Sequence, residues 1–280
     1  MSVITMRSTL IAVLFVATGC VGEVGDPGPT GVDPDPTTTA AGRTAYTRDV
    51  HPIVNARCSG GACHSQLGAT GMYGFADPVA ASSYTQVTTT PLLVGTYTAS
   101  SAGLLTKISA GHKGLTYTPA ETSAITQWLA QEVTDREDSG APPPIDPVAR
   151  LSAWTGCLSL ENFAAANMTT AWSTLGTAQN QACLNCHNGG LATFLVSADE
   201  AVFFRGVTEQ KDFLLKYFTV DATGQVVINT AAMRSAGETL EGHPRFNPTT
   251  NAGMTALEEL HTLTLARQTA GTCDPPRLLP

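Results

Sequence analysis

The chain has 280 residues, which is enough for two small domains or one large one. Its formal net charge is -8 and it has few lysines, so no basic surface is available to neutralise the phosphates of a nucleic acid or an anionic membrane. Charged residues make up only 14% of the chain, whereas Gly, Ala, Thr and Pro are plentiful. This composition favours a loop-rich exported protein over a packed cytosolic α/β enzyme.

The amino terminus predicts export. Arg7 is followed by a short apolar run over residues 10–17 and then by small residues before Cys20. The run is too short to span a bilayer and is typical of a cleaved signal peptide, here residues 1–19. The ending "ATGC" resembles the lipobox of bacterial lipoproteins, with Ala17 where that family most often has Leu. The resemblance implies that Cys20 is lipidated and anchors the protein in the periplasm or at the outer membrane; the alternative is an ordinary secretory signal with Cys20 incidental.

Two segments of biased composition divide the mature chain. Residues 20–42 are rich in Gly, Pro, Asp and Thr and nearly lack large apolar side chains, which predicts a disordered tether after the lipidated cysteine. Residues 139–148 form a Pro-rich linker. We therefore expect one domain over 43–138 and a second over 149–280.

Helical patterns dominate both halves. An apolar helix face leads into Cys58, and a capping box with Pro at the first helical position begins a helix at residues 118–121. In the second half, residues 160–175 are expected to form a helix, and a terminal helix is marked by Leu257, Leu260, Leu263 and Leu265. No segment alternates in the manner of a strand, so the expected fold class is mainly α.

The halves also resemble each other in the order of their motifs. Each has a helix, a Cys/Cys-His cluster, a Gly-containing loop, a Leu-Leu pair near a lysine, a Gly-His pair and a last helix. The Gly-His pairs end in His112 and His243. This order predicts a divergent internal repeat.

All seven cysteines can be assigned. Cys20 is the lipidation site and four others belong to the two clusters, which leaves Cys157 and Cys273. In an exported protein these two are expected to form a disulfide, and closing a loop of about 116 residues contributes about 4 to 5 kcal/mol on the chain-entropy model. The alternative is a pair of free thiols, which an oxidising compartment disfavours.

The stretch "CLNCH", residues 183–187, has the C-x-x-C-H signature of c-type haem attachment, and here the chain resembles the c-type cytochromes. The resemblance implies that the thiols of Cys183 and Cys186 bind the haem vinyl groups as thioethers and that His187 is the proximal iron ligand. At about 100° per residue the two cysteines lie about 60° apart on a helical turn, so both can reach one edge of the ring.

The stretch "CSGGACH", residues 58–64, is a longer version of the motif. An undistorted helix would turn Cys58 and Cys63 about 140° apart, so Gly60 and Gly61 are expected to let the chain bulge before the proximal ligand His64. Longer gaps occur among multihaem cytochromes. A zinc site or a disulfide within each cluster is the competing interpretation, although structural zinc needs about four ligands per site.

The repeat favours His112 and His243 as the sixth iron ligands, since each lies just before the last helix of its half. The alternatives are Met72 for the first haem and Met233 or Met254 for the second.

The remaining two histidines, His51 and His261, are expected to pack in the core or against a haem edge. Arg57 and Arg245 are the candidate partners of the haem propionates.

The resemblance as a whole implies two small cytochrome c-like helical domains with long loops, each with one covalently attached haem c. It implies an exported, membrane-anchored dihaem cytochrome that passes electrons between redox partner proteins and is a carrier rather than an enzyme. One alternative is a dihaem peroxidase, which needs a haem with an open face. The other is a colourless, non-haem structural lipoprotein with disulfide-linked cysteine clusters.

Overall fold

The computed structural model describes residues 41–60, 64–65, 74–178, 181–239 and 243–278, and the structural statements below refer to these residues. The predicted signal peptide, Cys20, Cys63 and Met72 lie outside them. None of the described helices is long and apolar enough to cross a membrane.

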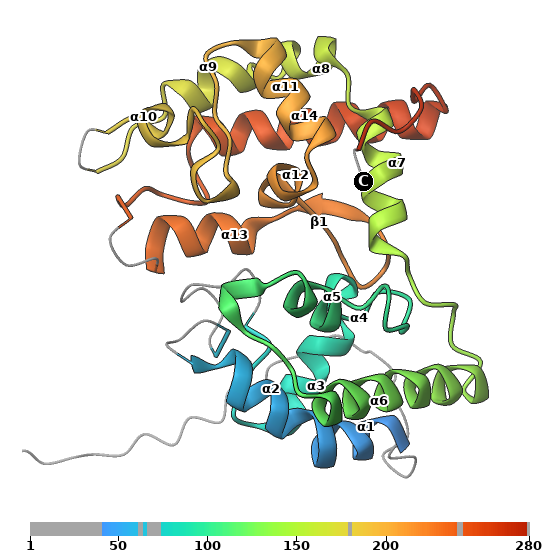
Figure 1. Cartoon of the computed structure of the whole chain (residues 1–280). Helices are drawn as coiled ribbons and strands as arrows, with labels where there is room; N and C mark the ends of the chain where they lie inside the picture. The colour runs from blue at the N-terminus through green and yellow to red at the C-terminus, as the bar shows by residue number, and fades with distance from the viewer. Residues whose placement is uncertain (1–40, 61–63, 66–73, 179–180, 240–242, 279–280) are drawn as a thin grey trace, which may run out of the picture. The chain divides into compact units, whose positions relative to one another are not determined.

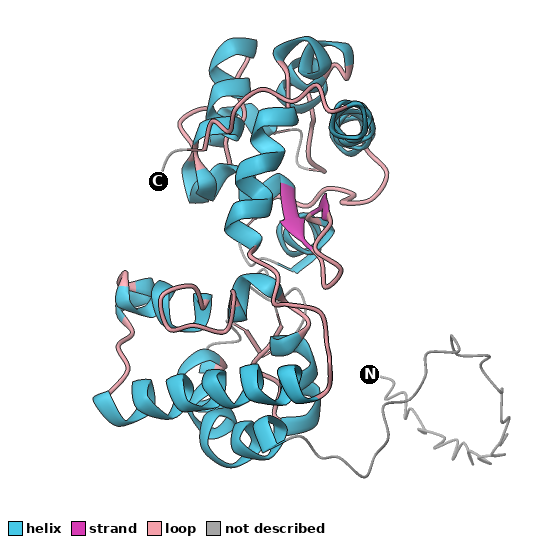
Figure 2. Cartoon of the chain, turned by 90° about the vertical axis from the view of Figure 1, so that its right-hand side faces the viewer, coloured by secondary structure: helices cyan, strands magenta, loops and turns pink. Residues whose placement is uncertain are grey.

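The chain is mainly α-helical, as the sequence predicted, and the short strand pair is the exception (Figure 2). The elements of the first half are α1 (Ala41–Ala45), the π-helix η1 (Tyr46–Val50), α2 (His51–Cys58), α3 (Ala80–Thr88), α4 (Pro91–Val94), α5 (Gly103–Ser109), the 3-10 helix η3 (His112–Gly114) and α6 (Pro119–Asp138). Helix α6 begins at the predicted capping box. The Thr118 hydroxyl accepts a hydrogen bond from the Glu121 amide at 3.2 Å, and the Glu121 carboxylate accepts one from the Thr118 amide at 2.7 Å.

The second half contains more elements. They are α7 (Pro147–Cys157), α8 (Leu160–Ala165), α9 (Met168–Ser173), α10 (Cys183–His187), η4 (Leu191–Thr193), α11 (Glu200–Glu209), α12 (Lys211–Tyr217), β1 (Phe218–Val220), β2 (Val226–Ile228), α13 (Thr230–Arg234), η5 (Ser235–Thr239) and α14 (Ala252–Ala270). The prediction of a single helix over residues 160–175 is wrong, because the segment forms two helices, α8 and α9. They are separated at Asn167, whose φ of 57° is left-handed, a conformation that asparagine tolerates.

The described strands form one antiparallel pair, β1 and β2, in which Thr219 lies opposite Val227. The strands are joined by a tight turn in which the Asp221 carboxylate accepts hydrogen bonds from the amides of Thr223 and Gln225, both at 2.9 Å. Each strand has three residues, too few for an alternating pattern to be visible in the sequence.

Residues 39–280 form one compact unit, within which the buried apolar side chains gather into two clusters. The buried members of one cluster lie within residues 46–129 and those of the other within residues 151–260, and no residue of the predicted linker 139–148 is among them. In both halves an early helix packs on the last one: α1 contacts α6, and α9 contacts α14 (Figure 1). The last helices, α6 and α14, are therefore the main packing partners within the two clusters.

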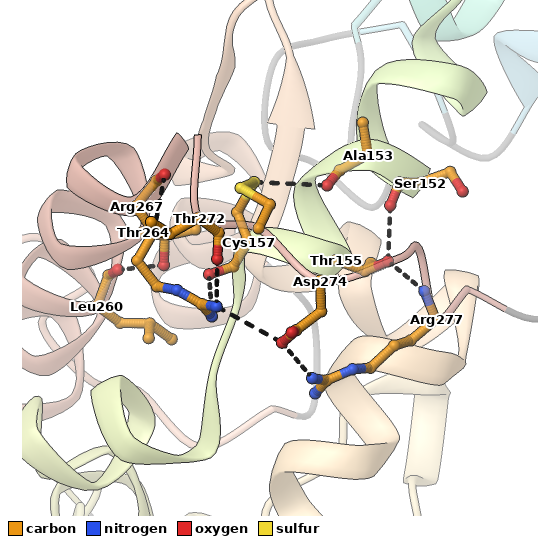
Figure 3. The surroundings of a disulfide bond; sticks show 11 residues. Ser152, Ala153, Thr155, Cys157, Leu260, Thr264, Arg267, Thr272, Asp274 and Arg277 are labelled. Carbon is orange, nitrogen blue, oxygen red and sulfur yellow. Dashed lines mark hydrogen bonds and ion pairs between the residues drawn. A yellow bond between two sulfur atoms is a disulfide. The ribbon is translucent and has the colours of Figure 1, made fainter. Parts of the chain in front are cut away.

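A disulfide joins Cys157 at the end of α7 to Cys273 beyond α14, the pair assigned to each other from the sequence (Figure 3). The Arg267 guanidinium lies beside it and donates to the carbonyl oxygens of Cys157 at 3.1 Å and Thr272 at 2.6 Å. The Asp274 amide donates to the Gly156 carbonyl at 2.9 Å. These bonds hold the carboxyl-terminal segment against α7.

Candidate cofactor site

Helix α10 is the "CLNCH" motif folded into a single helical turn. Within it His187 is buried, Cys183 is half-buried and Cys186 is exposed, and both cysteines carry free thiols. The amide of Cys183 donates to the Leu175 carbonyl at 3.0 Å, which ties the turn to the end of the preceding helix. The turn thus presents two thiols and one imidazole from five consecutive residues.

The hydrogen bonds of His187 fix which ring nitrogen can bind a metal. Its Nδ1 lies 2.9 Å from the carbonyl oxygen of Leu191 and 3.1 Å from that of Phe194. Carbonyl oxygens only accept, so the network assigns the proton to Nδ1 and leaves Nε2 as the basic nitrogen. Burial lowers the pKa of His187, which favours the neutral ring. A neutral imidazole whose other nitrogen is held by a carbonyl is the usual form of a metal-binding histidine.

His243 faces His187 from a distant part of the chain. The two ring centroids lie 6.1 Å apart with an angle of 39° between the rings, and Nδ1 of His243 lies 2.9 Å from the Pro244 carbonyl oxygen. A metal held between two imidazoles lies about 2.0 Å from each nitrogen, and each nitrogen lies about 1.1 Å from its ring centroid, which gives a centroid separation of about 6.2 Å. The observed centroid spacing is therefore one at which both imidazoles could bind the same metal ion.

A cavity of about 310 Å³ adjoins these groups. Its described lining is mostly apolar and includes both thiols and both imidazoles of the second site. The lining residues are Trp172, Thr177, Gln181, Ala182, Cys183, Cys186, His187, Leu191, Ala192, Phe194, Lys216, Ala232, Met233, Ala236, His243, Pro244 and Phe246. The Trp172 indole N–H is buried and has no hydrogen-bond partner among the described residues. These residues fit a haem, because two thiols and two imidazoles line one mostly apolar cavity.

The first half brings together the matching pair of histidines. The rings of His64 and His112 also have centroids 6.1 Å apart, with an angle of 35° between them. His112 begins η3 directly after Gly111, whose φ of 85° is the left-handed conformation that favours glycine. Cys58 is buried at the end of α2, with its Sγ 3.9 Å from the Tyr117 hydroxyl.

The surroundings of the two proximal histidines repeat as well. The His64 carbonyl accepts a hydrogen bond from the Ala76 amide at 2.8 Å, and the His187 carbonyl accepts one from the Val196 amide at 3.0 Å. A phenylalanine ring lies against each imidazole, at 4.6 Å for Phe75 and His64 and at 5.0 Å for Phe194 and His187. The internal repeat expected from motif order therefore extends to local geometry at both sites.

The bulge expected from Gly60 and Gly61 stays a prediction. At Gly60 a Cβ would meet no atom within 4 Å. Its companion in the motif, Gly61, lies outside the described residues.

The other histidines and methionines named from the sequence have different surroundings. Nε2 of His51 is 2.9 Å from the Asp77 carbonyl oxygen, and Nε2 of His261 is 2.8 Å from the Val226 carbonyl oxygen, so both rings are engaged in packing. Met254 is buried but is not among the described residues that line the cavity, whereas Met233 is.

The charged groups near the sites also differ from expectation. Arg57 makes a two-bond ion pair with Glu121, at 2.9 and 3.1 Å, which engages the guanidinium that was a candidate propionate partner. The cavity instead contains Lys216 and the indole of Trp172, which the sequence did not single out as site residues. The only sequence signal for Lys216 was its place beside the repeated Leu-Leu pair.

Among the described residues, no group of three or more His, Cys, Asp or Glu side chains is arranged to hold a metal ion by itself. Comparison with protein-family models, curated proteins and solved structures finds no match to the chain. The function must therefore be inferred from the site residues and their geometry.

Proposed function

We propose that the protein is a dihaem c-type cytochrome that carries electrons between redox partner proteins. The observation that supports this most is the pair of imidazoles in each half, with centroids 6.1 Å apart in both cases. One member of each pair directly follows a cysteine motif. Two similar ligand pairs in one chain are hard to attribute to chance packing of lone histidines.

The side chains have distinct tasks in this proposal. The thiols of Cys183 and Cys186, and those of Cys58 and Cys63, hold the cofactor covalently. His187 and His243 would bind the iron in the second half and His64 and His112 in the first, and the apolar lining of the cavity in the second half would exclude water. A bound haem c supplies a one-electron iron couple.

The axial histidines favour a carrier over a peroxidase. A peroxidase needs one haem with an open face, whereas each half has a second imidazole, 6.1 Å from the first between ring centroids, that could also bind the iron. A zinc site needs about four protein ligands converging on one ion. Two imidazoles facing each other beside an apolar cavity instead suit an iron whose remaining ligands come from a porphyrin.

The proposal includes the predicted cellular context. A signal peptide over residues 1–19 and a lipidated Cys20 would place the two haem domains, 43–138 and 149–280, on the periplasmic side of a membrane or at the outer membrane. A flexible tether would let both domains reach soluble partners. These parts rest on the sequence alone.

The deciding experiment is expression of the full chain in a host that matures c-type haem. The denatured protein is expected to keep haem through electrophoresis, and its mass should exceed that of the processed polypeptide by two haems. The matched variant Cys183→Ala/Cys186→Ala should carry one haem fewer. A colourless protein with no added mass would overturn the proposal and favour the structural lipoprotein.

A further inference from the structure

The cavity of the second site has a single cation among its described lining residues, Lys216 on α12. The side chain is half-buried, and burial lowers the pKa of its ammonium group. No Asp or Glu is among the described residues that line the cavity. Asp212 on the same helix raises this pKa in part and is one nearby counter-charge, so an anion inside the cavity would add a second.

Trp172, whose ring also lines the cavity, has a buried indole N–H. The side chain is 1% exposed and is fixed by edge contacts with Phe194 and Tyr217, at centroid distances of 5.4 and 5.6 Å. Its Nε1 has no hydrogen-bond partner among the described residues. A buried donor without an acceptor costs about 1 to 3 kcal/mol, so an acceptor on the occupant of the cavity would be favoured.

We propose that Lys216 and Trp172 together bind the carboxylates of the haem in the second site. The inference rests on the proposed function and deepens it. Haem carries two propionate groups that are anionic at neutral pH, so it can supply both the counter-charge and the acceptor. The apolar remainder of the lining suits the porphyrin face.

In the first half, the lysine that corresponds to Lys216 is not placed to act as such an anchor. Lys107 occupies the corresponding place beside the repeated Leu-Leu pair, but its side chain is exposed. Its ammonium lies 3.4 Å from the Asp212 carboxylate, where an exposed ion pair contributes little. The Lys216–Trp172 anchor is therefore specific to the second haem.

The test compares two cavity variants, Lys216→Met and Trp172→Phe, with two matched controls. Lys211→Met removes an exposed lysine from the same helix, and Trp154→Phe removes another indole N–H without a described partner that does not line the cavity. All variants are made in the full chain with both haems attached. The readouts are haem content by mass, reduction potentials, and infrared difference spectra between the reduced and oxidised protein.

Both cavity variants should keep two haems and shift the carboxylate bands of the infrared difference spectrum. In Lys216→Met the reduction potential of the second haem should fall, because reduction adds an electron that nearby positive charge stabilises. The first haem should keep its potential, and neither control should change bands or potentials. Lys216→Arg, which keeps the charge, should retain the potential of the unsubstituted protein.

Unchanged carboxylate bands and potentials in both cavity variants, with both haems attached, would overturn the anchor and leave the proposed function intact. An unsubstituted chain that attaches no haem would overturn the proposed function instead. If Lys216→Met fails to fold, Trp172→Phe and Lys216→Arg still decide. The anchor would be contradicted if Trp172→Phe left the carboxylate bands unchanged and Lys216→Arg failed to retain the reduction potential of the second haem.

Discussion

At the scale of single residues, the two histidine pairs are the sharpest feature of the molecule, and each pair lies within its own half. If each pair binds one haem iron as proposed, His112→Ala should open only the first haem and His243→Ala only the second. Each variant should gain high-spin ferric character in electron paramagnetic resonance and bind carbon monoxide. The unsubstituted protein should be low-spin and show no substantial peroxide turnover.

A matched control for these variants is His51→Ala, since the His51 ring is engaged with a backbone carbonyl. It should leave both haems low-spin. A stoichiometric high-spin haem with rapid peroxide turnover in the unsubstituted protein would favour the peroxidase. A low-spin spectrum that survives both ligand substitutions would instead direct attention to Met233, which lines the second cavity.

The sequence revealed the candidate ligands but not the cavity wall. His112 and His243 could be proposed because a duplicated Gly-His pair stands at the same place in both halves, a signal that a lone histidine would not provide. Trp172 and Lys216 lie 44 positions apart in the printed chain and line the same cavity only in the folded structure. No local pattern marks either of them as a site residue.

At the scale of elements, α6 contains a buried carboxyl group, Glu132, that packs against α1. Its oxygens accept hydrogen bonds from the Trp128 indole at 3.0 Å and the Tyr84 hydroxyl at 3.3 Å. Gly42 of α1 lies so close to the carboxylate that a Cβ at that position would clash. Burial raises the pKa of Glu132 and outweighs these hydrogen bonds and the nearby Arg136, which lower it.

The raised pKa of Glu132 predicts a pH-dependent stability. The folded protein binds this proton more tightly than the unfolded chain, so the associated stabilisation is complete below the unfolded pKa, near 4.5, and is lost as pH rises through the folded pKa. Each unit of the rise corresponds to about 1.4 kcal/mol. Glu132→Gln, which stays neutral, should therefore flatten the fall in the free energy of unfolding between pH 5 and pH 8.

Denaturant unfolding at several pH values measures this effect, with Glu137→Gln as the control on the exposed side of α6. The control should keep the slope of the unsubstituted protein. An equal slope in Glu132→Gln would show that the carboxyl group is ionised in the folded state over the whole range.

The elements also show where sequence patterns succeed and fail. The capping box at Thr118 and Glu121 specified the start of α6, because the two residues satisfy each other's backbone amides. The break at Asn167 was missed, since apolar residues continue on both sides of it and only the left-handed backbone separates α8 from α9. The expected mainly helical class was confirmed nonetheless, because it depends on many residues and not on any one boundary.

At the scale of the whole molecule, the residues of both candidate sites that the structure describes lie between positions 58 and 246. The predicted anchor, Cys20, precedes every described element. If Cys20 carries lipid and the tether is flexible, Cys20→Ala should release the protein from the membrane fraction while its visible absorbance and reduction potentials stay unchanged. Fractionation followed by spectroscopy of the soluble and membrane pools measures both properties. Unsubstituted protein found entirely in the soluble pool would contradict the lipid anchor. If the released Cys20→Ala protein lost its visible absorbance, the expectation that the tether can change without affecting the haem sites would be contradicted.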